Sequence, residues 1–516
     1  MNSLPPQQRA AVHHTDTYDY PNAPFEPGER FPECVHLPYE QDIRQGNVVY
    51  AHVRESLELL GLDAENRGTP EWNPFKDLVR PGQHTTIKPN LVRAVHPLGE
   101  EGTKSMISQA AVIRPLVDYV LLATKGEGTI VIGDVPLQSS NWEKIIEGSG
   151  LKALVEFYAE KGINIELLDL RKEISQQNKD GVIIDRDFQD RDPRGYTAVN
   201  IGADSRLMPV IEHAELFEIT DYGKGTVPPH HNKEVNEYYV PNSVLQADFF
   251  LNVPKLKTHR KAGLTCAMKN LIGINGDKRW LAHHRRGSTK HGGDEYEKFH
   301  ATLWLKWHIF SFLKRHKWSL PLAVLVRKVH GLIFHHGKTA DEVEVEESVT
   351  HATTREETGT AEGSWYGNDT IWRCIIDLNN IILFADKSGA LQKTRQRSYL
   401  GVVDGLLGGE REGPMEHTPK KAGILIAALN PVTIDYAAAH VMGFDWKRIP
   451  QVREAFGTQE PFPLAPYAAE DVELTSNDPS IDSLHLDFIP TRGWKGEIER
   501  DGYVEPETSK QEQSVA

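Results

Sequence analysis

The chain has 516 residues, of which 39% are hydrophobic and 25% are charged, and its formal net charge at pH 7 is −15. This length allows two or three domains with large cores, and the acidic balance argues against a general nucleic-acid-binding protein. The sequence has three cysteines, Cys34, Cys266 and Cys374, and no CxxC pair. We therefore exclude a cysteine-based zinc site and a local iron–sulfur motif, and we expect a reducing compartment.

The sequence contains no pattern typical of export or membrane insertion. Residues 1–25 lack the apolar core of a signal peptide. No window holds about 18 uninterrupted apolar residues, the length of a membrane-spanning helix. We therefore expect a cytoplasmic protein.

Strands alternate with helices through the first part of the chain. Residues 1–45 are polar and proline-rich, so we expect an arm that is disordered or wrapped on the body. The hydrophobic spacing then predicts, in chain order, a helix at 46–62, a strand at 84–87, a helix at 109–124, a strand at 129–132, a helix at 141–161 and a strand at 163–168. This alternation is typical of a parallel α/β sheet.

The rest of the chain is less regular but contains further apolar strands. The pattern predicts a hairpin-like turn at 180–181, strands at 248–253, 399–403 and 422–428, and helices at 264–274, 365–386 and 431–442. Residues from 471 onward are polar, and we expect a loose tail. The predicted fold class is α/β, with mixed or mostly parallel sheets flanked by helices, in two α/β halves plus a helical insertion.

These elements suggest a division of the chain into six parts. They are an arm and helix at 1–80, a first α/β half at 81–298, a basic helical insertion at 299–340, an acidic linker at 341–364, a second α/β half at 365–470 and a polar tail at 471–516.

The insertion differs in composition from the rest of the chain. Residues 299–338 contain no Asp or Glu and combine aromatic residues with cations. This composition is typical of an amphipathic helical hairpin that lies on a membrane surface, which would make the protein peripheral at the inner membrane. The alternative is a hairpin whose apolar face packs on its own domain or on a partner.

A basic cluster follows the strand predicted at 248–253. It contains Lys255, Lys257, His259 and, after a short apolar segment, Lys269 with Asn270. Open α/β sheets bind ligands at the carboxyl ends of their strands. Close cations lower one another's pKa, which suits a lysine acting as base or nucleophile, and they equally suit recognition of a phosphate or carboxylate. The alternative is a solvated basic loop.

Two other strand ends offer polar side chains. Lys88 and Asn90 flank Pro89, either as a simple strand-terminating turn or as a rigidly held anion-binding lysine. The glycine-rich residues 404–414 are expected to form a loop that carries Asp404, Glu410 and Glu412. These carboxylates suit a metal, a sugar hydroxyl or general-base work, and the alternative is a solvated acidic turn.

No cofactor motif is present, and a metal remains open. The glycines fit neither GxGxxG nor a P-loop, so we expect no standard dinucleotide or ATP site. His283 and His284 are adjacent and cannot chelate one metal as an i, i+4 pair would. One of them could join His259 in a metal site.

The chain resembles the bacterial family called domain of unknown function 362. The resemblance spans roughly residues 85–450 and rests on segments that occur in the family's order: Ile87–Asn90, Asp248–His259, Met268–Gly273, Val403–Gly405 with Glu412–Pro414, Asn430–Asp435 and Met442–Asp445. The name implies no established activity. Many members carry an added ferredoxin-like cysteine cluster, which this chain lacks, so the resemblance implies no iron–sulfur role here.

A fainter similarity involves the nickel-pincer lactate racemase family. That family has a strand-end histidine, a cofactor-anchoring lysine ten residues later and a further nickel-binding histidine, and His259, Lys269 and His283 or His284 are similar. Thr265–Met268 replace the glycine-rich run that precedes the family's lysine. The resemblance implies a metal-dependent racemase or isomerase as an alternative function.

Together these patterns predict one cleft at the strand ends of an enzyme that acts on an anionic, hydroxyl-bearing small molecule. The expected catalytic residues are Lys269, His259 and Asp404, and the expected substrate-binding residues are Lys88, Asn90, Lys255, Lys257, Asn270, Glu410 and Glu412, with Asp134 as a further acid. A non-catalytic ligand-binding protein that docks on a membrane or partner through 299–338 is the other alternative.

Overall fold

The computed structural model describes residues 6–177, 183–219, 225–297 and 361–506. The predicted hairpin at 299–338 and most of the acidic linker lie outside these residues. In the described part, strands from both predicted halves join one sheet of ten strands, in the order β16-β1-β15-β14-β10-β2-β3-β4, with β11 and β12 added beside β14.

The sheet is mixed and mostly parallel. Its strands are β1 (Arg9–His14), β2 (His84–Pro89), β3 (Thr129–Asp134), β4 (Glu166–Asp169), β10 (Phe249–Val253), β11 (Lys255–His259), β12 (Gly263–Thr265), β14 (Ser398–Glu412), β15 (Glu416–Ala428) and β16 (Glu473–Ser476). The run β14-β10-β2-β3-β4 is parallel throughout, whereas β15 is antiparallel to both β14 and β1. The predicted α/β class is confirmed.

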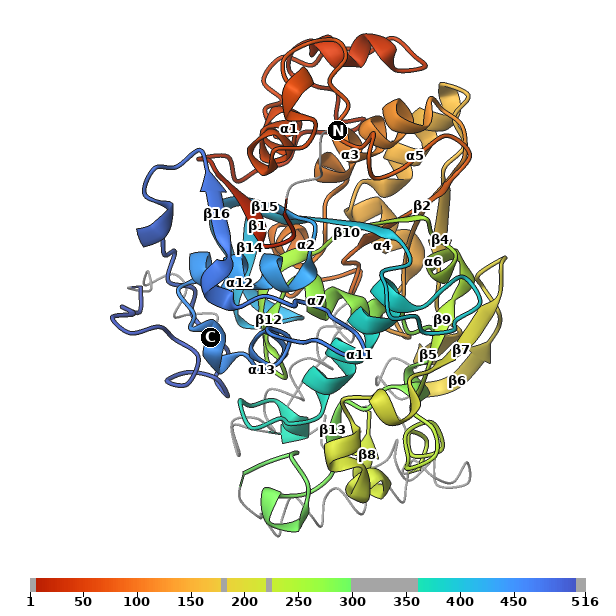
Figure 1. The fold of residues 1–516 in the computed structure, drawn as a ribbon, viewed down its shortest axis with the longest axis vertical. Coiled ribbons are helices and arrows are strands. Elements are labelled where there is room, and N and C mark those ends of the chain that lie inside the picture. The colour runs from red at the N-terminus through yellow and green to blue at the C-terminus, as the bar shows by residue number, and fades with distance from the viewer. Residues whose placement is uncertain (1–5, 178–182, 220–224, 298–360, 507–516) are drawn as a thin grey trace, which may run out of the picture.

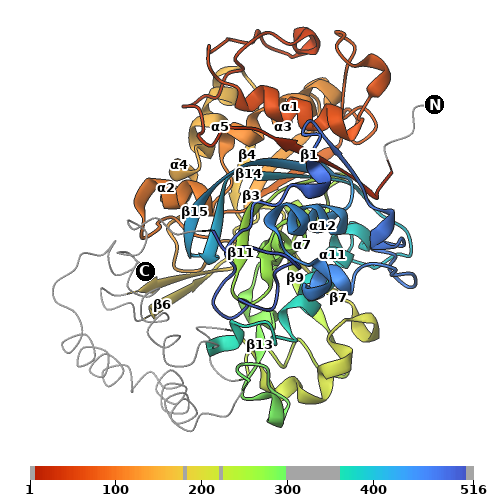
Figure 2. The ribbon, with the colours of Figure 1, turned by 90° about the vertical axis from the view of Figure 1, so that its left-hand side faces the viewer.

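Helices cover both faces of this sheet (Figures 1 and 2). On one face lie α1 (Val49–Leu60), α2 (Gly99–Met106), α3 (Ala110–Thr124), α4 (Trp142–Gly148) and α5 (Leu151–Glu160). On the other face lie α7 (Ala267–Asn270), α11 (Ile371–Phe384), α12 (Pro431–Met442) and α13 (Pro450–Arg453). Each layer of helices encloses its own hydrophobic core against the sheet.

Smaller elements surround this body. Three two-stranded sheets pair β5 (Glu173–Gln177) with β6 (Ile183–Phe188), β7 (Tyr196–Asn200) with β9 (Glu237–Pro241) and β8 (Phe217–Glu218) with β13 (His284–Arg285). The antiparallel pairing of β5 with β6 agrees with the predicted hairpin, whose turn at 180–181 lies outside the described residues. The short helix α6 (Asn242–Leu245) leads into β10.

The glycine-rich residues 404–414 were expected as a loop, and this expectation is wrong. β14 continues through them to Glu412 and pairs with β15 over most of its length. The glycines serve close packing, because a Cβ at Gly409 would lie 2.3 Å from the His417 ring. The predicted helix at 141–161 is also two helices, α4 and α5, which are separated at Gly150 with φ of +77°.

Both ends of the chain belong to the body. The arm contributes β1, which lies between β15 and β16. The expected loose tail contributes β16, and its Phe488, Trp494 and Ile498 are buried. The prediction of a loose tail is therefore wrong for the described residues up to 506, because a few large apolar side chains anchor a segment that is polar on average.

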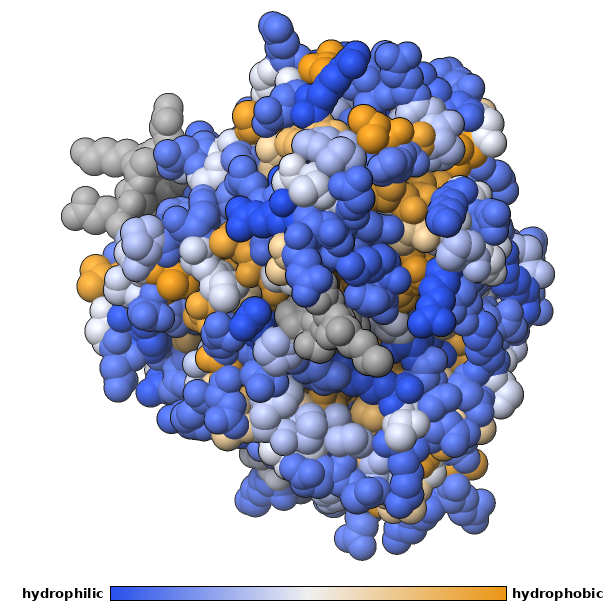
Figure 3. Space-filling view, turned by 45° about the horizontal axis from the view of Figure 1, so that its top comes forward, coloured by the Kyte–Doolittle hydropathy of each residue, from blue (hydrophilic) through white to orange (hydrophobic). Residues whose placement is uncertain are grey.

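One helical segment among the described residues, Gly99–Thr124, is long and apolar enough by composition to span a membrane. In the structure 94% of its most apolar window is buried inside the protein, as expected for a core helix. The side that bears α1 and α3 is mostly hydrophilic, with hydrophobic residues scattered over it (Figure 3). Scattered apolar residues of this kind are ordinary for a protein surface.

The role of the C-terminal segment is testable at Trp494. Its indole Nε1 donates a hydrogen bond of 2.8 Å to the Arg260 carbonyl, and the side chain is 1% exposed. We expect Trp494→Ala to lower the free energy of unfolding by about 3–5 kcal/mol in urea denaturation, because it opens a cavity. Val504 is 70% exposed, and Val504→Ala is expected to change it by less than about 0.5 kcal/mol. Equal effects of the two variants would contradict an anchored C-terminal segment.

Candidate active site

The carboxyl ends of three neighbouring parallel strands bring the predicted site residues together. β2 ends at Lys88 and Pro89, β3 ends at Asp134, and β10 leads through Pro254 into Lys255. Asn252 on β10 is level with Lys88 on β2 in the sheet register. This edge is where open α/β sheets bind ligands.

Lys88 forms a buried ion pair with Asp134. The Lys88 Nζ lies 2.7 Å from Asp134 Oδ1, and both side chains are almost fully buried. Asp134 Oδ2 also accepts a hydrogen bond of 2.6 Å from the Leu91 amide. Burial lowers the pKa of Lys88, and the facing carboxylate opposes that shift. Gly273 allows this arrangement, because a Cβ there would lie 2.4 Å from Asp134 Oδ1.

Three asparagines form an amide network beside this pair. Asn270 Oδ1 accepts hydrogen bonds from Asn90 Nδ2 at 2.9 Å and from Lys88 Nζ at 3.2 Å. Asn270 Nδ2 donates to Asn252 Oδ1 at 2.7 Å. The network fixes the orientation of each amide, and it leaves the buried Asn90 Oδ1 with no hydrogen-bond donor in the described structure. This oxygen is therefore available to a donor on a ligand or water.

Lys255 forms a second buried ion pair, with Asp404. The Lys255 Nζ lies 3.0 Å from Asp404 Oδ2, and both side chains are fully buried. Tyr20 completes the group, since its hydroxyl donates to Asp404 Oδ1 at 2.6 Å and accepts from Lys255 Nζ at 2.7 Å. The Gln109 amide also donates to Asp404 Oδ2 at 2.9 Å. Because both carboxylate oxygens of Asp404 are already bonded, this geometry favours a role in positioning Lys255. It disfavours a role for Asp404 as a general base.

Three further lysines lack a carboxylate within ion-pair distance among the described residues. Lys257 is fully buried and donates a hydrogen bond of 2.6 Å to the Met106 carbonyl. Lys278 lies 3.4 Å from the Val135 carbonyl oxygen. Lys269 is partly exposed and makes no hydrogen bond to any described residue. Positive charge thus exceeds negative charge at this edge of the sheet.

The pKa of each of these lysines is lowered. Burial and the ammonium of Lys278 lower the pKa of Lys269 from 10.5 to about 7. Burial lowers the pKa of Lys278 to about 8, against the opposing effect of Asp134. Burial, then Lys269 and Lys255, hold the pKa of Lys257 well below its ordinary value. A cluster of this kind favours either neutral amines or a bound anion.

His259 lies against the same lysines. Its Nδ1 accepts hydrogen bonds from the amides of Lys261 and Ala262, at 3.1 and 3.2 Å, so the ring proton is on Nε2. Burial and the charges of Lys269 and Lys257 hold its pKa well below its ordinary value. A neutral His259 therefore presents an Nε2–H donor.

The histidines proposed as metal ligands come together only in part. After burial and the neighbouring lysines, His283 also lowers the pKa of His259. Burial and then Lys261 lower the pKa of His284, and His259 is not among the causes. Nδ1 of both His283 and His284 is buried without a hydrogen-bond partner. Within the described chain, these three histidines do not form a group whose ligand atoms all lie within 4.8 Å of one another.

Glu410 and Glu412 contact the C-terminal segment and not the lysines of the cluster. Glu410 Oε2 accepts from the Ile489 amide at 3.0 Å and lies 3.3 Å from Lys420 Nζ. Glu412 Oε1 accepts from the Arg492 amide at 2.8 Å. The structure therefore gives both residues a visible role in anchoring residues 489–492.

Several residues of the site were not anticipated from the sequence. His417 Nε2 lies 2.9 Å from Ser105 Oγ, and its ring lies 4.7 Å from that of His96, centroid to centroid. Burial lowers the pKa of both histidines, and the charge of Lys257 adds to this effect. Tyr20 was missed because it lies in the polar arm with no motif around it. Lys278 could have been found, since it continues the basic run that contains Lys269.

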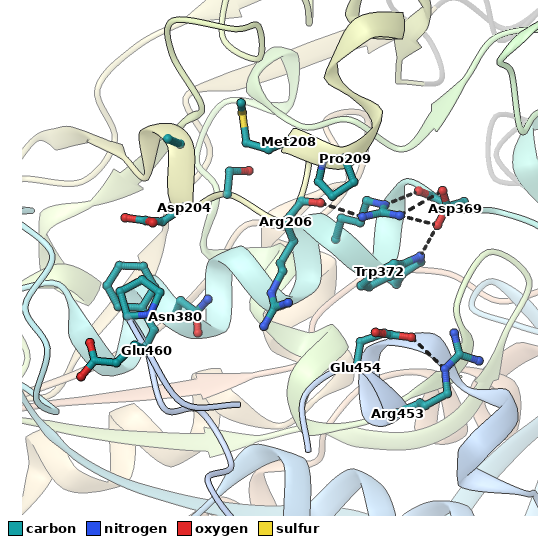
Figure 4. Close-up of a pocket in the computed structure, with 15 residues that line it drawn as sticks. Asp204, Arg206, Met208, Pro209, Asp369, Trp372, Asn380, Arg453, Glu454 and Glu460 are labelled. Carbon is teal, nitrogen blue, oxygen red and sulfur yellow. Dashed lines mark hydrogen bonds and ion pairs between the residues drawn. The ribbon is translucent and has the colours of Figure 1, made fainter. Parts of the chain in front are cut away.

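A surface cavity lies elsewhere. It has a volume of about 570 Å³ and is bordered by the segment 203–209, by α11 and by residues 453–462. Figure 4 shows the Arg206 side chain extending into this space, with Asp369 on one side. Arg373 Nη2 donates a hydrogen bond of 3.0 Å to Asp369 Oδ1. No residue of the lysine and histidine cluster lines it. The cavity holds no comparable group of pKa-shifted side chains, so we place the candidate active site at the strand ends.

Comparison with protein-family models matches residues 182–440, half of the chain, to the family described as Domain of unknown function (DUF362). The chain belongs to the DUF362 family. The matched range contains Lys255, Lys257, His259, Lys269 and Asp404. No curated protein and no solved structure matches the chain. The likeness to nickel-pincer lactate racemases therefore has no support from these comparisons.

The DUF362 match leaves part of the site outside its range. Lys88, Asn90 and Asp134 precede residue 182, and so does Tyr20. Lys88 and Asp134 form one buried pair with each other, and the Tyr20 hydroxyl bonds both members of the other pair. The N-terminal part of this chain therefore contributes side chains to the candidate site that lie outside the matched range.

The ion pair in this site is testable by a double-mutant cycle. Asp134→Asn leaves Lys88 buried without a counter-charge, and we expect it to lower the free energy of unfolding by about 3–5 kcal/mol. Adding Lys88→Met to this variant removes the uncompensated charge. The double variant is therefore expected to lose less unfolding free energy than the two single variants lose in sum. Urea denaturation measures the free energy of unfolding of the wild type, the two single variants and the double variant. Additive effects would contradict a direct interaction between the two side chains.

Proposed function

We propose that the protein is an enzyme that binds an anionic, hydroxyl-bearing small molecule at the strand ends and uses Lys269 to move a proton. The observation that carries this proposal is the state of Lys269. It is the partly exposed lysine of the cluster, it lacks a bonded partner among the described residues, and its pKa is lowered to about 7. A general base is most effective when its pKa lies near the operating pH.

The neighbouring groups divide the remaining tasks. Lys257 and Lys278 provide positive charge for a phosphate or carboxylate, and a bound anion compensates charge that no described carboxylate balances. The Nε2–H of His259 and the free Asn90 Oδ1 suit a hydroxyl group, which both accepts and donates hydrogen bonds. Lys88 and Lys255, already paired, keep this edge of the sheet rigid.

The lowered pKa of Lys269 predicts its chemical reactivity. The neutral amine is the form that reacts with acylating reagents, so acetylation of Lys269 is expected to reach half its maximal rate near pH 7 and to fall at lower pH. Brief labelling across a pH series, followed by peptide mass spectrometry, measures this profile. Lys393, whose side chain is 78% exposed, is the reference in the same digest. Parallel profiles for Lys269 and Lys393 would overturn the assignment of Lys269 as the base.

Anion binding predicts protection of the same amine. Inorganic phosphate or citrate in the cluster raises the pKa of Lys269, so labelling at pH 7 is expected to slow as the anion is added. Lys257→Met removes one charged contact, which is worth about 1.5–3 kcal/mol, and is expected to raise the half-protective concentration at least about tenfold.

The control for this experiment is Lys420→Met, which removes a lysine paired with Glu410 outside the cluster. It is expected to leave the protection unchanged. Equal protection in the wild type and in Lys257→Met would contradict an anion site that includes Lys257.

A metal-dependent isomerase is the second candidate. His259, Lys269 and His283 are electrostatic neighbours, as a lysine-anchored metal cofactor would require. Intact mass and elemental analysis of protein from its own host separate the two candidates. An added mass on Lys269 with nickel favours the isomerase, whereas an unmodified, metal-free chain favours the anion-binding enzyme.

The docking role proposed for 299–338 rests on composition alone. We propose that this basic, aromatic segment brings the protein to an anionic membrane surface, because interleaved cations and aromatic residues favour that interface. This membrane contact would determine where the enzyme acts, and it would leave the chemistry at the strand ends unchanged.

A further inference from the structure

A second group of ligating side chains lies far along the sheet from the lysines, between β1 and α1. His13 belongs to β1, and His52 and Glu55 belong to α1, three residues apart on one helical face. Successive side chains of a strand point to opposite faces of the sheet. Ala10 and Val12 pack in one core, and Ala11 packs in the other, which contains the apolar residues of α1. His13 therefore lies on the same face as Ala11, which α1 covers. The three side chains therefore meet in the layer between helix and sheet.

Their separations fit a small divalent cation. His13 Nε2 lies 3.0 Å from His52 Nδ1, and Glu55 Oε2 lies 3.5 Å from His13 Nδ1 and 3.9 Å from His52 Nδ1. Tetrahedral zinc binds nitrogen and oxygen at about 2.0–2.2 Å, which places its ligand atoms roughly 3.3–3.5 Å apart. With Nδ1 as the ligand atom of both histidines, the separations of 3.5 and 3.9 Å from Glu55 Oε2 lie close to that spacing. One ligand atom from each of the three residues lies within 4.8 Å of the other two. The described residues contain no other group of three such ligands within 4.8 Å.

An unsatisfied atom points to a missing ligand. His13 is 1% exposed, and its Nδ1 has no hydrogen-bond partner. Buried polar atoms in folded proteins are nearly always bonded to protein, water or an ion. The remaining nitrogen of His52, Nε2, lies 3.0 Å from Thr15 Oγ1 and 3.2 Å from Thr17 Oγ1. Hydroxyls in this position hold the ring and leave Nδ1 directed at Glu55 and His13.

We propose that His13, His52 and Glu55 bind a zinc-class divalent cation that ties β1 to α1. The donor set of two imidazoles and one carboxylate suits zinc, and three protein ligands leave a position for water. The ion reaches the site through Glu55, whose side chain is 48% exposed. His14 does not take part, because its Nδ1 lies 2.8 Å from Asp478 on the other side of the strand.

The test compares metal binding by the full-length protein and by His52→Gln. The His52 side chain is partly exposed, at 17%, so this variant is expected to fold. Metal-stripped protein is titrated with cobalt(II), followed by its visible absorption, and bound zinc is then counted after dialysis. The wild type is expected to hold one more equivalent of zinc than His52→Gln. Zinc is also expected to raise the melting temperature of the wild type by more than that of the variant.

The matched control is His36→Gln, which alters an exposed histidine of the same region. It is expected to bind zinc like the wild type, which corrects for histidines elsewhere in the chain. Glu55→Gln is the second variant, and its loss of the same equivalent supports the site if His52→Gln does not fold. Equal zinc stoichiometry and equal melting shifts in the wild type and in whichever variants fold would overturn the proposal.

Discussion

The burial of lysine ammonium groups at one edge of the sheet is the constraint on which the site depends. A buried charge without a partner costs several kcal/mol, so each lysine must be paired, neutralised or bound to an anion. Lys88 and Lys255 are paired with Asp134 and Asp404. The buried Lys257 and Lys278 and the partly exposed Lys269 have no carboxylate within ion-pair distance in the described parts of the chain, and the pKa of each is lowered. Functional sites are where proteins retain such unfavourable arrangements.

Strand β10 makes this arrangement possible because it joins the two parts of the chain. It pairs with β2 on one side and with β14 on the other. Lys88 and Asp404 are more than three hundred residues apart in sequence, yet Lys88 lies beside β10 and Asp404 lies beside the segment that follows it. The two predicted halves are therefore not separate units in the structure, since the site is formed along the line where their strands meet.

Much of the sheet followed from hydrophobic patterning, and much of the site did not. Apolar runs bounded by turn residues identified β2, β3, β10 and the buried part of β15. Glycine misled the prediction at 404–414, since it marks both loops and tightly packed strands, and only the partner, here His417, distinguishes them.

For the site, charge clustering identified the lysines but not their partners. No local pattern connects Tyr20 in the polar arm with Asp404, because their contact depends on how the arm crosses the sheet. The pairing of Glu410 and Glu412 with residues 489–492 has the same origin. Long-range contacts between unremarkable polar residues are the part of a site that a single sequence does not reveal.

The position of β1 has a consequence for how the protein is made. β1 is synthesised well before its neighbours β15 and β16, which lie at 416–428 and 473–476. At about 5–20 residues per second, some 400 residues of synthesis take roughly 20–80 s. During that time the backbone of β1 has neither of its two partner strands to pair with. The strand order of the sheet therefore means that β1 pairs only after most of its other strands have been made.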